Sequence, residues 1–335
     1  MSRSVNFGLW YDFRNPQESR SFETLYRESL DQIVWAETLG FGSVWLTEHH
    51  FCDDGYTPSP LVIAAAIGER TQRLRIGTNL MLLPLADPIR LAEDAATLSI
   101  LTSGRFDLGV GLGYRELEFD YFGRKLVNRP SLMEEGIDIL RQAWSGNRVS
   151  HSGKRFNVDN LQVSPTPHTA PRIFMGGMST PAIERAARLG DGFLSTGGIG
   201  HDVYVDALAK PSQGAICAGN WAIISPDPER EAAHVGEHVL YQTNQYVSWG
   251  AFGPPDEVPA FPDAQSAIRD GLYELWDAQL AISSLTEMLR EYPQIVDVHF
   301  WAQFPGESVA SGSRRIEYIA NQVLPVVRKN LAIDP

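Results

Sequence analysis

Two kinds of segment alternate along the first 200 residues: short runs rich in β-branched and aromatic residues, and longer runs in which apolar residues recur at helical spacing. This alternation predicts a mainly parallel β-sheet whose connections are helices packed outside it. The short runs are VNFGLW (5–10), SVWLT (43–47), RIGTNLMLL (75–83), RFDLGVG (105–111), RIFMG (172–176) and GFLST (192–196).

Helix boundaries are marked by capping residues, prolines and glycines. The segment after the first run is predicted to be a helix that Gly40 ends. Asp87-Pro88 and Thr180-Pro181 predict two more helix starts, because each pair offers a capping oxygen followed by a proline in the first turn. The apolar residues that define the first helix are Leu25, Leu30, Ile33, Val34, Ala36 and Leu39.

The rest of the chain completes the count of strands. AICAGNWAIIS (215–225) and VDVHFWAQF (296–304) predict a seventh and an eighth strand, and residues 313–329 a last helix. Eight strand–helix units favour a (β/α)8 TIM barrel over an open doubly wound sheet. A barrel takes roughly 250 residues plus insertions, so we interpret residues 1–335 as one domain.

Two regions interrupt the alternation and are expected to be insertions. Residues 150–171 are polar and proline-rich, and residues from about 197 to 270 contain long irregular stretches. The second region includes FGPPDEVPAFPDA (252–264), which we expect to act as a lid, because long loops in compact barrels are usually functional.

Composition narrows the range of partners. The net charge of −13 disfavours nucleic acid and anionic membrane surfaces. The longest apolar stretches, such as LVIAAAI (61–67), fall well short of the roughly 20 residues that a membrane helix needs. Only Cys52 and Cys217 occur, and the start of the sequence lacks the plan of a signal peptide, so we expect a reduced, cytoplasmic protein.

The first candidate site is Glu48-His49-His50, at the end of the strand predicted for 43–47. In a barrel, catalytic residues follow the carboxyl ends of strands. Neighbouring residues on an extended chain point in opposite directions, so the two imidazoles should not share one ligand, and a two-histidine metal site is disfavoured. One imidazole can act as a proton-transfer or orienting group. The alternative is a hydrogen-bonded histidine at the barrel rim beside a solvated one.

The second candidate is the strand-to-helix turn in PRIFMGGMSTPAIERAA (171–187). Gly176 and Gly177 leave room for an anion, and the helix that follows Ser179 and Thr180 offers free backbone N–H groups and the positive end of its dipole. This arrangement predicts a phosphate site. The alternative is simple helix capping by Thr180.

The third candidate is the glycine-rich segment 104–123. The dinucleotide fingerprint G-x-G-x-x-G fails here, because Tyr114 stands at the position of the last glycine. Glycines at the end of a strand instead suggest flat backbone against which a planar ring can lie, with Tyr114 and Glu118 at the mouth. The alternative is a barrel rim where glycine only relieves crowding.

Other histidines give weaker signals. His234 and His238 lie one helical turn apart but lack a third ligand, so we interpret them as a solvated helix face and predict no metal site. His299 on the last predicted strand can face either the barrel mouth or the helix layer.

Taken together, four segments resemble the bacterial luciferase-like flavin-dependent monooxygenases. They cover most of residues 5–200 in the order typical of the family: TEHHF (47–51), GTNLMLLPLADPIRLAED (77–94), SGRFDLGVGLGYRELEFDYFG (103–123) and APRIFMGGMSTPAIERAARLGDG (170–192). The resemblance implies a TIM barrel that binds reduced FMN, or in some branches a deazaflavin coenzyme, at its C-terminal mouth. It also implies a separate flavin reductase as the source of reduced flavin, and a homodimer.

The resemblance also assigns site residues. His49 takes the position of the catalytic histidine, and Glu48 and His50 are expected to fix its orientation and tautomer. Asn79 and Leu80 fall where the family has a non-proline cis peptide beneath the flavin ring. The predicted cofactor-binding residues are Asn79, Leu80, Gly111, Tyr114, Gly176, Gly177, Met178, Ser179 and Thr180.

One departure concerns the cofactor phosphate. Luciferase has an arginine in the glycine-rich segment that reaches the phosphate, and Leu112 stands at that place here. Neither Arg105 nor Arg115 can simply be assumed to replace it. We therefore expect a lower FMN affinity.

These features predict a monooxygenase that uses reduced FMN and molecular oxygen to oxygenate a small organic substrate. The alternatives are a deazaflavin-dependent oxidoreductase of the same fold, or a non-catalytic flavin-binding subunit that needs a companion chain. Residues 197–275 match the family poorly, so the substrate is not assigned, and light emission is not predicted.

Overall fold

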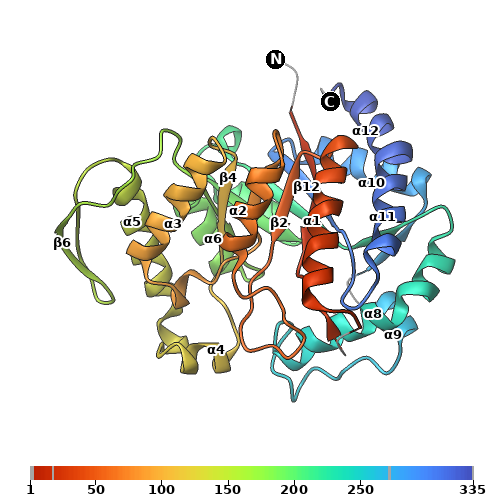
Figure 1. The fold of residues 1–335 in the computed structure, drawn as a ribbon, viewed down its shortest axis with the longest axis horizontal. Helices are drawn as coiled ribbons and strands as arrows, with labels where there is room; N and C mark the ends of the chain where they lie inside the picture. Colours follow the sequence, from red (N-terminus) through yellow and green to blue (C-terminus); the bar gives the residue numbers. More distant parts are fainter. Residues whose placement is uncertain (1–3, 17–18, 271–272, 334–335) are drawn as a thin grey trace.

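A closed barrel of eight parallel strands forms the centre of the molecule, in the order β1-β12-β9-β8-β7-β4-β3-β2 (Figure 1). The structure is a computed structural model that describes residues 4–16, 19–270 and 273–333. This architecture confirms the predicted TIM barrel. The barrel strands are β1 (Asn6–Tyr11), β2 (Ser43–Leu46), β3 (Arg75–Thr78), β4 (Phe106–Val110), β7 (Arg172–Gly176), β8 (Gly192–Thr196), β9 (Ile216–Asn220) and β12 (Ile295–Trp301).

Helices surround the barrel, as Figure 1 shows. The predicted last helix, residues 313–329, is divided, because a π-helical turn at Ile319–Val323 separates α11 from α12. The helices are α1 (Phe22–Thr38), α2 (Pro60–Arg70), α3 (Pro88–Leu101), α4 (Glu116–Tyr121), α5 (Arg129–Trp144), α6 (Thr180–Leu189), α7 (His201–Ala207), α8 (Pro228–Ser248), α9 (Ala264–Arg269), α10 (Ala278–Glu291), α11 (Val309–Tyr318) and α12 (Leu324–Leu331).

One predicted helix cap is confirmed and the other is displaced by a residue. The Asp87 carboxylate accepts hydrogen bonds from the N–H groups of Ile89 and Arg90, as expected for the start of α3. The cap of α6 is Ser179 rather than Thr180, and the Ser179 side chain makes no capping hydrogen bond. That hydroxyl is therefore left for another partner.

Two predicted strands are shorter than expected. β3 ends at Thr78, and the chain regains contact with β4 only at an isolated bridge between Met81 and Val110. The run 215–225 is divided: β9 ends at Asn220, and β10 (Ala222–Ile224) leaves the barrel to pair with β11 (Glu274–Trp276). An apolar run is buried equally well inside the barrel and beside it. The length of the run 215–225 therefore did not reveal where the chain leaves the barrel.

The two predicted insertions differ in kind. Residues 150–171 include most of an antiparallel hairpin of β5 (Val149–Ser152) and β6 (Asn157–Leu161), which Figure 1 shows projecting from one side of the barrel. Residues 197–270 contain barrel strand β9 as well as α7, α8 and α9. The second region therefore combines a barrel unit with added structure.

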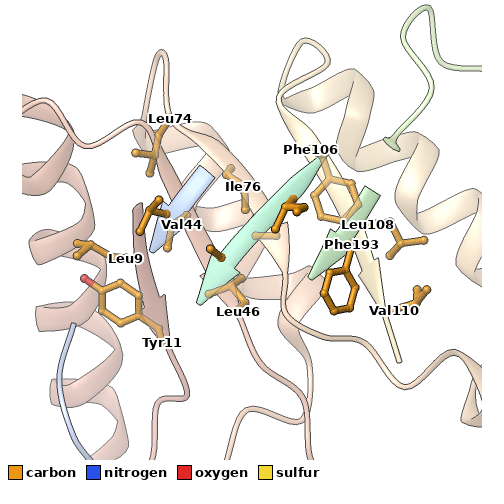
Figure 2. Packing of buried hydrophobic residues seen from close by; sticks show 14 of the residues in the cluster. Leu9, Tyr11, Val44, Leu46, Leu74, Ile76, Phe106, Leu108, Val110 and Phe193 are labelled. Carbon is orange, nitrogen blue, oxygen red and sulfur yellow. The ribbon is translucent and has the colours of Figure 1, made fainter. Parts of the chain in front are cut away.

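Alternate residues of the strands face opposite layers. Leu9 and Tyr11 of β1 belong to the cluster that also contains Ile33 and Ala36 of α1, between the strands and the helices. Figure 2 shows this layer continuing along neighbouring strands. Trp10 belongs to a second cluster, inside the barrel and its mouth. Because side chains alternate in direction along a strand, the indole ring of Trp10 lies toward the barrel axis.

Within the described ranges, we find no helix that combines the length and apolar character required to cross a membrane.

Candidate active site

A cavity of about 680 Å³ lies at the barrel mouth, where several strands end. It brings together residues from all four segments on which the resemblance rests. The predicted residues that line it are Glu48, His49, Asn79, Leu80, Gly111, Tyr114, Gly176, Gly177, Met178 and Ser179. His50 and Thr180 do not line it, so the prediction that neighbouring His49 and His50 face different ways is confirmed.

His49 is held at both ring nitrogens. Its Nδ1 lies 2.9 Å from Oε1 of Glu118, and its Nε2 lies 3.1 Å from the hydroxyl oxygen of Tyr114. Both side chains come from the segment that follows β4, whereas His49 follows β2. The imidazole is therefore fixed across the barrel mouth by a carboxylate on one side and a phenol on the other.

Burial and hydrogen bonding set the protonation states of this trio. Burial lowers the pKa of His49, and the carboxylate of Glu118 offsets the effect only in part. Burial acts to raise the pKa of Glu118, but the hydrogen bonds from His49 and the His50 N–H and the charge of Arg115 outweigh it, and the pKa is lowered. Burial also raises the pKa of Tyr114. Glu118 is thus an anion that accepts the Nδ1 proton, and Tyr114 donates to the Nε2 lone pair.

Glu118 also organises the backbone of this corner. Its Oε1 accepts the N–H of His50 at 2.8 Å and a hydrogen bond from Arg115 at 3.0 Å. Arg115 in turn donates to the carbonyl oxygen of His50 and stacks 4.3 Å from the ring centre of Trp249. This buried network makes Glu118 the orienting partner of His49.

The expected roles of Glu48 and His50 need correction. Both ring nitrogens of His49 are engaged by Glu118 and Tyr114, so neither Glu48 nor His50 fixes its tautomer. Glu48 instead accepts the N–H of Leu82 and lies 3.3 Å from Nε2 of His50. It joins the end of β2 to the loop after β3, which is a structural role.

A row of hydrogen bonds runs from the barrel interior to Asn79. Nδ2 of Asn79 lies 2.9 Å from Nε2 of His299, and Nδ1 of His299 lies 3.0 Å from Oδ1 of Asp297. The carbonyl oxygen of Asn79 accepts the indole N–H of Trp10 at 3.2 Å. His299 therefore faces the barrel interior, which the sequence left open, and it holds the Asn79 carboxamide in one orientation.

The Asn79–Leu80 peptide is cis, as the resemblance implies. Leu80 forms part of the cavity floor and lies between two glycines. A β-carbon at Gly111 or at Gly176 would overlap the Leu80 side chain. The missing methyl groups let the ends of β4 and β7 approach this leucine closely.

The turn into α6 forms one end of the cavity. Gly177, Met178 and Ser179 line it, and the positive end of the α6 dipole lies there. Close packing explains one glycine, because a β-carbon at Gly177 would meet that of Ala182 at 2.5 Å.

Neither arginine considered from the sequence lies free at this end. Arg105 donates to the backbone carbonyls of Gly68, Thr71 and Leu74 near the start of β4, and Arg115 is bound to Glu118.

A third arginine, which the sequence analysis did not consider, lies at the cavity. Half-buried Arg129, the first residue of α5, lines the same cavity as Ser179. Sequence reasoning missed it. The only signal was the helix start at Asn128-Arg129-Pro130, which does not show where the Arg129 side chain points.

The remaining candidates are ordinary parts of the fold. His234 lies 3.2 Å from the Ser311 hydroxyl, and His238 bonds the carbonyl oxygen of Pro305. No cluster of metal-ligating side chains occurs among the residues that the structure describes.

The expected lid is only partly at the cavity. Of residues 252–264, Phe252 lines the cavity, whereas Phe261 is tied through its backbone to the side chain of Asn244 on α8. The loop is therefore anchored at its far end.

Comparison with known proteins fits this geometry. The family model described as Luciferase-like monooxygenase matches residues 5–220, which is more than half of the chain. The chain belongs to the luciferase-like monooxygenase family. The matched region includes the cavity residues His49, Asn79, Gly111 and Ser179.

Relatives in the luciferase-like family differ in their coenzymes and reactions. The chain is 30% identical over 189 residues to an F420-dependent glucose-6-phosphate dehydrogenase of Amycolatopsis mediterranei, covering 54% of this chain and 57% of that protein. It is 33% identical over 158 residues to the alkanal monooxygenase alpha chain of the Kryptophanaron alfredi symbiont, covering 46% and 44%. The matched part spans about half the length of the curated relatives.

The solved structures support the luciferase-like fold over nearly the whole chain. Monooxygenase RslO1 of Streptomyces bottropensis superposes with a TM-score of 0.82 at 21% identity, covering 96% of this chain and 99% of that chain. The family model ends at Asn220, whereas the cavity continues beyond it through Trp221, Tyr246, Ala251 and Phe252. The part of the cavity outside the family match therefore comes after β9.

Proposed function

We propose that this protein is a flavin-dependent monooxygenase that uses reduced FMN and molecular oxygen to oxygenate a small organic substrate. The observation that carries the proposal is a buried, neutral His49, anchored through Nδ1 to Glu118, whose Nε2 side lies at a cavity suited to a ring cofactor. An imidazole fixed in this tautomer is ready to exchange a proton with a group bound beside it.

The residues present fit a flavin. The floor of Leu80 between Gly111 and Gly176 offers a flat surface for a ring. One end of the cavity offers an anionic tail the Ser179 hydroxyl, the positive end of the α6 dipole and the charge of Arg129. The cavity volume of about 680 Å³ lies within the range of small-molecule sites.

A bound reduced flavin supplies the electrons that activate oxygen. The chain itself holds the ring, excludes water and manages protons. For His49 to reach a bound group, the Tyr114 hydroxyl must leave Nε2, to which it lies at 3.1 Å. Glu118 then stabilises the imidazole whenever it gains a proton, because its carboxylate stays ionised beside Nδ1.

Aromatic side chains line this region. Trp10 and Trp221 meet edge to face with ring centres 6.1 Å apart, and Phe252 lines the same cavity. A site lined by rings favours an apolar substrate and shields reactive groups from solvent.

The second candidate is a deazaflavin-dependent oxidoreductase, in which the coenzyme transfers hydride and oxygen is not used. Two observations favour it: the similarity to an F420-dependent dehydrogenase, and Leu112 in place of the arginine that luciferase uses for the phosphate. The TEHHF segment and the His49–Glu118 pair favour the oxygenase.

The deciding experiment is titration of the purified protein with oxidised FMN, reduced FMN and the deazaflavin, followed by flavin fluorescence and, for reduced FMN, anaerobic absorbance. The proposal predicts that reduced FMN binds tightest. Tight binding of the deazaflavin alone contradicts the cofactor assignment and supports the second candidate.

A non-catalytic flavin-binding subunit is tested with His49→Ala. The monooxygenase proposal predicts that this variant retains flavin binding but alters the rate at which bound reduced FMN is reoxidised by oxygen. An inert binding subunit predicts equal rates in both proteins.

The proposed function includes a separate flavin reductase that supplies reduced FMN. It also includes a homodimer of this chain. Exposed apolar residues on two adjacent helices support the dimer: Val62 on α2, 71% exposed, and Ile100 and Leu101 on α3. Light scattering of the wild type and of Val62→Asp tests it, and a wild-type monomer at micromolar concentration contradicts it.

A further inference from the structure

The Asn79 carboxamide has one polar atom bound to the protein and one that faces the cavity. Its Nδ2 lies 2.9 Å from Nε2 of His299. Its Oδ1 makes no hydrogen bond with the described residues, and it is not among their side-chain atoms that are both buried and unpaired, so it is accessible. Asn79 lines the barrel-mouth cavity, and the accessible oxygen therefore opens onto it.

The hydrogen bonds behind Asn79 fix which atom faces the cavity. Asp297 accepts the hydroxyl proton of Ser43 and, at 2.9 Å, the indole N–H of Trp45. Asp297 thus acts as an acceptor, and Nδ1 of His299 donates to it at 3.0 Å. With the ring proton on Nδ1, Nε2 of His299 accepts. The atom of Asn79 that faces Nε2 must therefore be the donor Nδ2, which leaves Oδ1 for the cavity.

Packing restricts the orientation of His299. Its ring centre is 5.3 Å from the ring centres of both Trp10 and Trp45. A β-carbon at Gly219 would lie 3.2 Å from its Nε2, so the neighbouring strand β9 also approaches closely. Trp10 in addition donates its indole N–H to the Asn79 carbonyl oxygen, which fixes the backbone of that residue. The carboxamide and its support are therefore in place before a ligand binds.

This support is buried along its whole length. His299 is fully enclosed, and Asp297 is 2% exposed. If the carboxamide turned over, Oδ1 would face Nε2 of His299, and two acceptors would meet without a proton between them. Water cannot relieve such a contact in a buried site, so the observed orientation is strongly favoured.

A fixed acceptor at the cavity floor distinguishes the two redox states of a flavin. Reduced FMN carries an N–H at N5 of its central ring, whereas N5 of oxidised FMN has only a lone pair. Leu80, the residue after Asn79, belongs to the floor that we propose for the ring, so Oδ1 lies at that floor. Next to N5, it gains a hydrogen bond from the reduced form and meets a second acceptor in the oxidised form.

We propose that His299 and Asp297 are positioning residues that hold Oδ1 of Asn79 toward N5 of the flavin, where it accepts the N–H of the reduced form. The inference rests on the proposed function, because it concerns the same cofactor in the same cavity. Neither His299 nor Asp297 lines the cavity, so both act through Asn79. A deazaflavin has carbon in place of N5 and gains nothing from this acceptor.

The test compares FMN with 5-deaza-FMN, in which carbon replaces N5 and the rest of the molecule is unchanged. Both are titrated in oxidised and reduced form, without oxygen, into the full-length protein. Quenching of tryptophan fluorescence reports binding, since Trp10 and Trp221 line the cavity.

The wild type is expected to bind reduced FMN roughly 10-fold tighter than oxidised FMN, because a hydrogen bond replaces a contact between two acceptors. This ratio corresponds to a rise of about 30 mV in the two-electron potential of bound FMN. The two forms of 5-deaza-FMN are expected to bind within about twofold of each other.

Two variants locate the effect. Asn79→Leu keeps the approximate shape of the side chain but removes the acceptor, and it is expected to reduce the preference for reduced FMN to about twofold or less. His299→Phe keeps a ring between Trp10 and Trp45 but releases the carboxamide, so the preference should also fall. Because His299 acts through Asn79, the double variant should lose no more of the preference than Asn79→Leu alone.

Tyr11→Phe is the matched control. Tyr11 follows Trp10 on β1, its buried hydroxyl donates to the Gln32 side chain at 2.8 Å, and it does not line the cavity. The variant loses one buried hydrogen bond and is expected to keep the full preference for reduced FMN. Thermal melting checks the folding of every variant, and the comparison of FMN with 5-deaza-FMN needs only the wild type.

Three results overturn the proposal: equal binding of reduced and oxidised FMN by the wild type, the same redox preference with 5-deaza-FMN, or a preference that survives in folded Asn79→Leu. A full preference in folded His299→Phe overturns the positioning role. The proposed function has a separate outcome. If neither form of FMN binds, that function is refuted and the inference with it, whereas FMN binding whose redox preference does not depend on Asn79 refutes the inference alone.

Discussion

Nδ1 of His49 lies 2.9 Å from Oε1 of Glu118, a residue 69 positions further along the chain. The pair joins the segment after β2 to the helix after β4, and it makes the tautomer of His49 a property of the folded barrel. Both groups are buried, so the carboxylate acts without solvent screening.

Glu118→Gln tests this pair. The amide keeps the shape but removes the anion that stabilises the protonated imidazole, so the pKa of His49 should fall further. We expect reoxidation of bound reduced FMN to change by about 10- to 100-fold, and the acid limb of its pH profile to move to lower pH. Stopped-flow absorbance between pH 5 and 9 measures both. Glu116→Gln, exposed on the same helix, should leave the profile unchanged.

Arg129→Ala tests the orientation of the cofactor. If Arg129 binds an anionic tail, its loss should weaken FMN binding by about 10-fold or more and leave riboflavin, which has no phosphate, nearly unaffected. Fluorescence titration with both flavins gives the comparison. Arg124→Ala is the control, because Arg124 stacks near Phe156 and does not line the cavity. Equal losses for FMN and riboflavin would contradict a phosphate role.

Gly111→Ala tests the flat floor. The added methyl group overlaps Leu80, so Leu80 must move toward the ring position, and FMN affinity should fall by about 10-fold or more. The double variant Gly111→Ala, Leu80→Ala removes the overlapping atoms and should recover part of the affinity. A single variant that binds FMN like the wild type would show that the floor does not contact the ring.

His201 should make the protein less stable in acid. Its Nε2 lies 2.7 Å from the Ser195 hydroxyl, and burial lowers its pKa to about 4. An unfolded histidine titrates near 6.5, so between these values the unfolded chain binds a proton that the folded protein does not. The free energy of unfolding should therefore fall, by up to about 3 kcal/mol, as pH decreases from about 6.5 to 4.

Urea unfolding from pH 7 to 4 measures this slope. His201→Gln should be less stable at pH 7 but lose less stability on acidification, whereas His168→Gln, at an exposed position, should keep the wild-type slope. A slope that is the same in the wild type and His201→Gln would contradict the assignment.

The sequence predicts the barrel well because strand and helix signals are local. The six barrel strands of the first 200 residues lie within the predicted ranges, apart from Tyr11, one residue past the first. β3 is shorter than predicted because apolar residues after Thr78 are buried at the cavity instead of in the sheet. The division of 215–225 into β9 and β10 was missed because burial in a barrel and burial beside it select the same residues.

The site is less accessible to sequence reasoning, because its contacts join distant segments. Nothing local to His49 reveals that Glu118 rather than Glu48 bonds to its ring. Arg129 follows a short 3₁₀ turn, so the direction of its side chain depends on how that turn packs. The assignment of these residues to roles in binding or catalysis stays a prediction until the variants are measured.

The end of β9 at Asn220 separates two parts of the cavity lining along the chain. The floor and the turn into α6 precede it, while Trp221, Tyr246 and Phe252 follow it in a stretch outside the barrel. A chimera that exchanges residues 221–270 with those of another member would therefore inherit a different selectivity and keep its own coenzyme. Within such a lineage, diversification can proceed by exchange of this one internal segment between two junctions.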